Sequence, residues 1–147
     1  MKKTIIAVWG NANTGKSSTI KLVFDIFNTI YQGQISVIDD GPLNTHDITK
    51  VFKCKNYIVG IESQGDPNSN IFSSLPMFVD KKCDLIICAT RTKGDTVRIV
   101  EDIEDKNKYD VIWLSNLFSG QKPSDILNKK TATFIHEIIT DLFSNTY

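Results

Sequence analysis

The sequence predicts an α/β protein: a three-layer α/β/α sandwich around a five-stranded, mainly parallel sheet. Short apolar, β-branched segments alternate along the chain with segments whose apolar residues recur at helical spacing. Strands that are separated by helices pair in parallel through right-handed crossovers, which place helices on both faces of the sheet. The five predicted strands are Thr4–Trp9, Gln34–Ile38, Tyr57–Ile61, Asp84–Ala89 and Val111–Leu114.

The helices are predicted from the spacing of apolar residues between these strands. One helix follows the first strand, and a short one is predicted from about Thr45. The pattern between residues 69 and 79 favours another helix, which Pro76 is expected to kink or end. Further helices are predicted from Asp95 and from Ser124, an N-cap candidate. The apolar positions are Ile20, Val23, Phe24, Phe27 and Ile30; Ile48, Val51 and Phe52; Val97, Val100 and Ile103; and Ile135, Ile138, Ile139 and Leu142.

Length and composition predict one domain over residues 1–147. The chain is long enough for one sizeable core. Its 17 basic residues balance 17 acidic ones, so no overall field attracts nucleic acid or an anionic membrane. No apolar run is long enough to cross a bilayer, and the three cysteines lack C-x-x-C spacing. The apolar start ends at Trp9, too early for a signal peptide, so a cytoplasmic protein is expected.

Residues 10–18 have a pattern that specifies a chemistry. They match G-x-x-x-x-G-K-[ST], a phosphate-binding loop, and lie between a predicted strand and a predicted helix. Gly10 and Gly15 are expected to adopt positive φ and to let a ligand approach the backbone. Successive backbone N–H groups and the helix N-terminus would then form an anion-binding concavity. The predicted phosphate-binding residues are Gly10, Asn11, Ala12, Asn13, Thr14, Gly15, Lys16, Ser17 and Ser18.

Over roughly its first 30 residues, the chain resembles the P-loop NTPase superfamily through this motif and its flanks. The resemblance implies a P-loop NTPase fold, ATP or another nucleoside triphosphate as ligand, and Mg²⁺ as cofactor. It also implies that Lys16 reaches the β- and γ-phosphates and that the Ser17 hydroxyl ligates Mg²⁺. Beyond these residues the resemblance is one of architecture.

The end of the third predicted strand supplies further candidates, because ligands bind at the carboxyl edge of a parallel sheet. Glu62 stands there, where a carboxylate could hold Mg²⁺ or act as a base toward an attacking water. The neighbouring Gln64 or Asp66 could orient that water, as a glutamine does in some GTPases. Alternatively, Glu62 caps the next segment or is a solvated loop charge.

Charged residues also end the second and fourth predicted strands. Asp39, followed by Asp40, could hold Mg²⁺ or an acceptor hydroxyl, as in small P-loop kinases, or could belong to a turn. Arg91 could stabilise charge on a transferring phosphoryl group, or could be a solvated charge at a helix entry. The preceding Thr90 could sense the γ-phosphate, as in AAA-type ATPases.

The loop after the last strand is the candidate site for the nucleotide base. In many P-loop proteins this segment packs against the base, so Asn116 is a nucleotide-binding candidate. Leu117 and Phe118 could form a wall for adenine, or could be core residues or a partner contact. The sequence Thr92–Asp95 also fits the guanine-reading [NT]-K-x-D motif. It lies too close to Glu62–Gly65 for a GTPase, so adenine is expected.

Three hypotheses for function are compatible with these residues. The leading one is a Mg²⁺-dependent ATPase that cleaves the γ-phosphate, slow alone and stimulated by a partner protein or a second copy. The second is a small-molecule or nucleotide kinase, although no arginine-rich lid follows the fourth strand. The third is a nucleotide-dependent switch with little catalysis.

Overall fold

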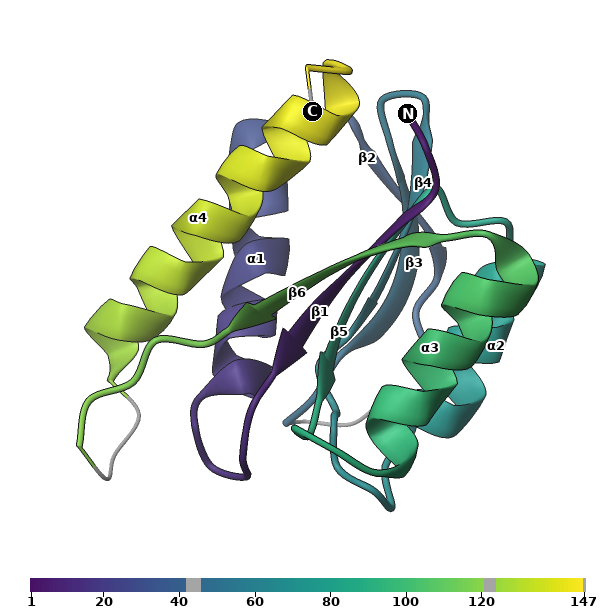
Figure 1. The fold of residues 1–147 in the computed structure, drawn as a ribbon. Helices are drawn as coiled ribbons and strands as arrows, with labels where there is room; N and C mark the ends of the chain where they lie inside the picture. Colours follow the sequence, from purple (N-terminus) through teal and green to yellow (C-terminus); the bar gives the residue numbers. More distant parts are fainter. Residues whose placement is uncertain (42–45, 121–123, 147) are drawn as a thin grey trace.

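The computed structural model describes residues 1–41, 46–120 and 124–146. A mixed sheet has two helices packed on each face, in agreement with the predicted α/β class (Figure 1). The strands are β1 (Thr4–Trp9), β2 (Ile35–Asp39), β3 (Thr49–Cys54), β4 (Tyr57–Glu62), β5 (Leu85–Thr90) and β6 (Asp110–Ser115). The helices are α1 (Lys16–Ile30), α2 (Ile71–Asp80), α3 (Asp95–Asn107) and α4 (Asp125–Phe143).

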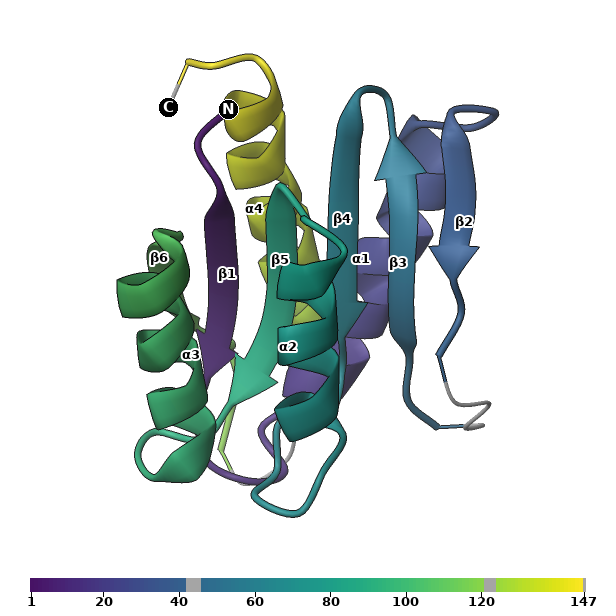
Figure 2. The ribbon, with the colours of Figure 1, turned by 90° about the vertical axis from the view of Figure 1, so that its right-hand side faces the viewer.

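The sheet of the described residues has six strands rather than the predicted five. Their order is β2-β3-β4-β5-β1-β6. The strands β4, β5, β1 and β6 pair in parallel, whereas β3 is antiparallel to both of its neighbours (Figure 2). The beginning of β3 therefore lies at the same edge of the sheet as the carboxyl ends of the other strands.

The additional strand is the segment predicted as a short helix. Ile48, Val51 and Phe52 have helical spacing, but Val51 and Phe52 enter the cores on opposite faces of the sheet. A strand covered on both faces of the sheet buries residues on both sides, so its apolar residues need not alternate with polar ones. The turn Lys55-Asn56 joins β3 to β4 as a hairpin, and Lys55 takes a positive φ of 54° there.

Two other predictions are decided by the described residues. Ser124 is the N-cap of α4, as predicted, and accepts a hydrogen bond from the Leu127 N–H at 3.5 Å. Pro76 does not end α2, which continues through it to Asp80. The predicted start of the short helix, Thr45, lies outside the described residues.

Two apolar cores fix the layers. Ile6 and Val8 of β1 belong to the core that includes residues of α1 and α4, whereas Ile5 and Ala7 belong to the core that includes residues of α2 and α3. These two helix pairs lie on opposite sides of the sheet (Figure 1). β1 is thus buried on both faces and paired with β5 and β6 at its edges, and it leads directly into the 10–18 loop. Among the helices of the described residues, none combines the length and apolar composition needed to span a bilayer.

Candidate functional site

The 10–18 loop connects β1 to α1 and presents unpaired backbone donors. The Gly10 N–H extends the sheet by donating to Thr90 O at 3.1 Å. The next backbone N–H with a partner in the described part of the chain is that of Thr19, which donates to Gly15 O at 2.9 Å. The N–H groups of residues 11–18, which lead into the first turn of a 15-residue helix, thus have no partner among the described residues. The N-terminus of a helix favours an anion.

The curl of the loop depends on Gly15 and Asn13. Gly15 has φ of 87°, and a Cβ there would lie 2.4 Å from Asn128 Oδ1. Asn13 also has a positive φ, of 60°. Gly10 differs from the expectation because it does not adopt positive φ. Its role is steric, since a Cβ there would lie 3.1 Å from Thr14 Oγ1.

Asn116, the candidate for base contact, lies beneath the loop and is buried. Its Nδ2 donates to Thr14 O at 2.7 Å and to Asn128 Oδ1 at 2.9 Å, and its Oδ1 accepts from Thr19 Oγ1 at 2.5 Å. The side chain therefore joins the end of β6 to the loop, to α1 and to α4. Leu117 and Phe118 are each about half exposed.

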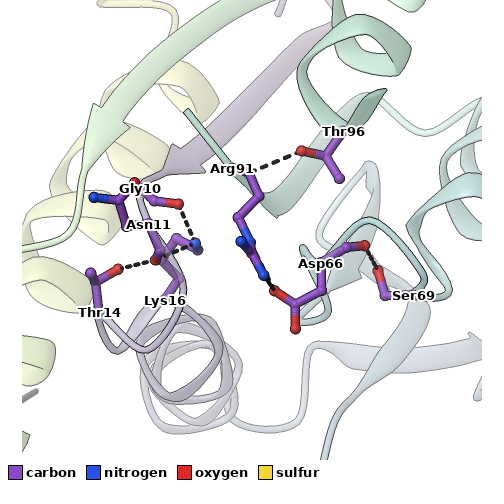
Figure 3. A network of polar contacts seen from close by, with 8 residues as sticks. All are labelled: Gly10, Asn11, Thr14, Lys16, Asp66, Ser69, Arg91 and Thr96. Atoms are coloured by element: carbon purple, nitrogen blue, oxygen red, sulfur yellow. Dashed lines mark hydrogen bonds and ion pairs between the residues drawn. The ribbon is translucent and has the colours of Figure 1, made fainter. Parts of the chain in front are cut away.

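Lys16 folds back over the loop. Its Nζ donates to Gly10 O at 2.5 Å and to Asn11 O at 2.9 Å (Figure 3). Burial, with a smaller contribution from the Arg91 charge and an opposing one from Asp66, lowers the pKa of Lys16 to about 8. An anion bound in the loop would raise that pKa again, because it favours the charged ammonium.

Arg91 extends from the end of β5 between the loop and Asp66 (Figure 3). Its Nε and Nη2 donate to Asp66 Oδ1 at 3.1 and 2.9 Å. The Arg91 backbone N–H donates to Thr96 Oγ1 at 2.9 Å, which fixes the entry to α3. The Arg91 side chain is one-third exposed.

A pocket of about 700 Å³ opens beside the loop. One wall consists of residues 13–18. The opposite wall is polar and is formed by Asp47 together with Ser63, Gln64, Gly65, Asp66, Asn68 and Ser69. Gly65 permits this arrangement, because a Cβ there would lie 2.6 Å from the Ala89 carbonyl.

Glu62 does not line the pocket, although it ends β4. It is fully buried, with Oε1 accepting from Thr49 Oγ1 at 2.8 Å and Oε2 from the Gln64 N–H at 3.0 Å. Burial raises the pKa of Glu62, and these two hydrogen bonds oppose that effect. The side chain thus anchors the start of the segment that forms the polar wall.

The pocket brings together some of the predicted residues and not others. The loop residues from Asn13 to Ser18 line it with Gln64, whose Oε1 accepts from the Asn70 N–H at 2.8 Å. Asp39 ends β2, four strand positions from β1, or roughly 19 Å along the sheet. Its Oδ1 accepts from the Gly41 N–H at 2.9 Å, and it does not line the pocket.

Asp47 and Asn128 belong to the site and were not predicted. Asp47 precedes β3, so its position depends on the β3–β4 hairpin. The prediction of a short helix in this segment did not include that hairpin. The signal was present in Thr49, Val51 and Phe52, residue types that favour strands, before the polar turn Lys55-Asn56. Asn128 carried no signal, because its contact with the loop depends on how α4 packs against α1.

The donor set fits Mg²⁺ rather than a softer metal. The groups at the pocket are hydroxyl and carboxylate oxygens, which a hard cation prefers. No cluster of three or more histidine, cysteine or acidic side chains suited to a metal occurs in the described ranges. A cation here would therefore take most of its oxygens from a bound phosphate and water. Comparisons with protein-family models, curated proteins and solved structures gave no match.

Proposed function

We propose that this protein binds Mg²⁺-ATP and hydrolyses it at the γ-phosphate. One observation supports this most strongly: residues 13–18, whose backbone N–H groups have no partner among the described residues, line a 700 Å³ pocket together with Lys16. The opposite wall supplies hydrogen-bond acceptors that could orient water. A site for phosphates alone would not need that second wall.

In this proposal the loop amides and Lys16 hold the phosphates, and Arg91 exchanges Asp66 for the γ-phosphoryl oxygens as negative charge develops. A water held by Gln64 or Asp66 attacks the γ-phosphorus. The bond to the β–γ bridging oxygen breaks, its electron pair stays on ADP, and the water proton leaves with phosphate or solvent. Mg²⁺, when bound, supplies positive charge that neutralises the phosphates.

The test is phosphate release by purified protein with Mg²⁺-ATP. We expect slow turnover, and we expect Lys16→Ala to lower it by about 100-fold or more, since it removes a charge aimed at the phosphates. Lys106→Ala, at an exposed position of α3 outside this pocket, is the matched control and should leave turnover unchanged. Absence of nucleotide binding by the wild-type protein would refute the proposal.

A kinase activity is the second candidate, and the polar wall favours it. Asp66, Asn68 and Ser69 lie on the side of the pocket that faces the loop. Their polar groups could bind an acceptor hydroxyl. The same assay with added sugars, nucleosides and hydroxy acids distinguishes the two reactions. Transfer of phosphate to an acceptor faster than its release to water would establish a kinase.

A further inference from the structure

We infer that Asp47, together with Ser17, holds the divalent cation of the bound nucleotide, and that the strand-end acid Glu62 does not. The inference rests on the proposed function, because the cation is the one that accompanies ATP. The sequence predicts Glu62 and Asp39 as ligands of the cation, because each lies at the end of a predicted strand. Asp47 replaces them in that role.

The β3–β4 hairpin brings Asp47 to the pocket. Its register pairs Thr49 with Glu62, and one step further the Ser63 N–H donates to Ile48 O at 3.0 Å. The Ile48 N–H donates in turn to Ser63 Oγ at 2.9 Å. Since the pairing continues beyond the strand, Asp47 is fixed at the carboxyl edge by the backbone of its neighbour.

The hydrogen bonds of Asp47 leave it poised to bind a cation. Its Oδ1 accepts from Ser17 Oγ at 2.7 Å and from Ser63 Oγ at 2.8 Å. Its Oδ2 has no partner among the described residues. The Ser17 proton is committed to Asp47, so the lone pairs of that hydroxyl oxygen stay available. A hydroxyl and one carboxylate, completed by phosphate oxygens and water, form a typical Mg²⁺ environment.

The other acids at this edge do not combine access to the pocket with a contact to Ser17. Both oxygens of Glu62 accept hydrogen bonds inside the protein, and the side chain has no exposed surface. Asp66 lines the pocket, but its hydrogen bonds come from Arg91 and not from Ser17. Asp39 bonds the Gly41 N–H and lies outside the pocket. Among the described acids, Asp47 alone contacts Ser17 and also lines the pocket.

The test is calorimetric binding of a non-hydrolysable ATP analogue, with excess Mg²⁺ and with EDTA. We expect Mg²⁺ to tighten binding to the wild-type protein by about tenfold or more. In Asp47→Asn this gain should disappear, whereas affinity in EDTA should be unchanged or higher because a negative charge near the phosphates is gone. Asp39→Asn is the matched control, the same substitution at the same edge, and should keep the gain.

Each outcome separates this inference from the proposed function. A Mg²⁺-dependent gain that survives in folded Asp47→Asn overturns the inference alone. If the wild-type protein binds no nucleotide under either condition, the proposed function and the inference fail together.

A second measurement uses the wild-type chain and does not depend on a variant. Fe²⁺ in place of Mg²⁺, with ascorbate and peroxide, should cut the backbone near residues 17, 47 and 63 when the nucleotide analogue is bound. Cutting near residue 39 without cutting near 47 would overturn the inference.

Discussion

The two walls of the pocket differ in chemistry and in construction. The wall from the 10–18 loop offers hydrogen-bond donors and positive charge, namely backbone N–H groups, a helix N-terminus and Lys16. The wall from Asp47, residues 63–66 and residues 68–69 offers two carboxylates together with hydroxyl and amide groups. A polyphosphate suits the first wall, and a cation or a water suits the second. Under the proposed function, the first wall would bind the nucleotide and the second would take part in the reaction.

The supports beneath the walls also differ. The loop rests on amide side chains, Asn116 and Asn128, which bond each other at 2.9 Å and tie together β6, α1 and α4. The polar wall rests on a buried carboxylate, Glu62, held by Thr49 and by the Gln64 N–H. Neutral groups therefore fix one wall, whereas an ionisable group fixes the other. Substitutions and changes of pH should therefore affect the stability of the two walls differently.

The largest effect is expected from Gly15→Ala, which breaks the loop wall. The new methyl group would overlap Asn128 at a residue with positive φ, so we expect a loss of about 4 kcal/mol of unfolding free energy. Gly33→Ala is the matched control, because it has a similar φ of 78° and nothing within 4 Å of its Cβ. It should cost about 1 kcal/mol. Urea unfolding measures both losses. Equal losses would show that Asn116 and Asn128 move away from the new methyl group at no cost in stability.

The loop wall could be predicted because its residues are contiguous. Residues 10–18 carry their own glycines, and the flanking strand and helix are apolar at distinct periods. The layers followed from the same periodicity. The strand order did not, because β5 lies between β1 and β4 and nothing local specifies that insertion.

The polar wall could be predicted only in part. Gln64 and Asp66 were found because they directly follow a strand. The position of Asp47 depends on the register of the β3–β4 hairpin. Because β3 is buried on both faces, it lacks the alternation of apolar and polar residues that identifies a strand. The hidden orientation of Glu62 depends on side-chain packing, because a residue at the edge of a sheet can turn inward or outward.

An intermediate effect is expected from His136, on the helix pair that supports the loop wall. Its ring packs on Phe27 with centroids 4.8 Å apart, and neither ring nitrogen has a hydrogen-bond partner in the part of the chain that the structure describes. Burial lowers its pKa from 6.5 to about 4. As pH falls from 6.5 to 4 the unfolded chain takes up the proton first. The folded state should therefore lose up to about 3 kcal/mol of stability over that range.

The measurement is urea unfolding of the wild-type protein and of His136→Phe between pH 7.5 and 4.5. Phenylalanine keeps the ring contact and removes the titrating group, so the variant should lack this part of the acid destabilisation. The difference between the two proteins isolates His136 from the other groups that titrate in this range. Parallel pH curves would contradict the assignment.

The smallest effect is expected from Thr49→Val, which weakens the support of the polar wall. It removes a hydrogen bond to a buried carboxylate, and we expect a loss of about 1.5 kcal/mol at alkaline pH. Because the lost bond favours ionised Glu62, the variant raises the pKa of that group further. The loss should be full where Glu62 is ionised and should shrink as pH falls and the carboxyl group takes up a proton.

Thr4→Val is the matched control for this pH dependence. Thr4 is a buried strand threonine whose hydroxyl donates to the Lys2 carbonyl at 2.9 Å, a neutral acceptor. Its loss should be about 1 kcal/mol at every pH. Thermal unfolding of both variants at several pH values tests the contrast. If Thr49→Val also costs the same at every pH, Glu62 is not an ionised support, and the two walls then rest on groups of the same neutral kind.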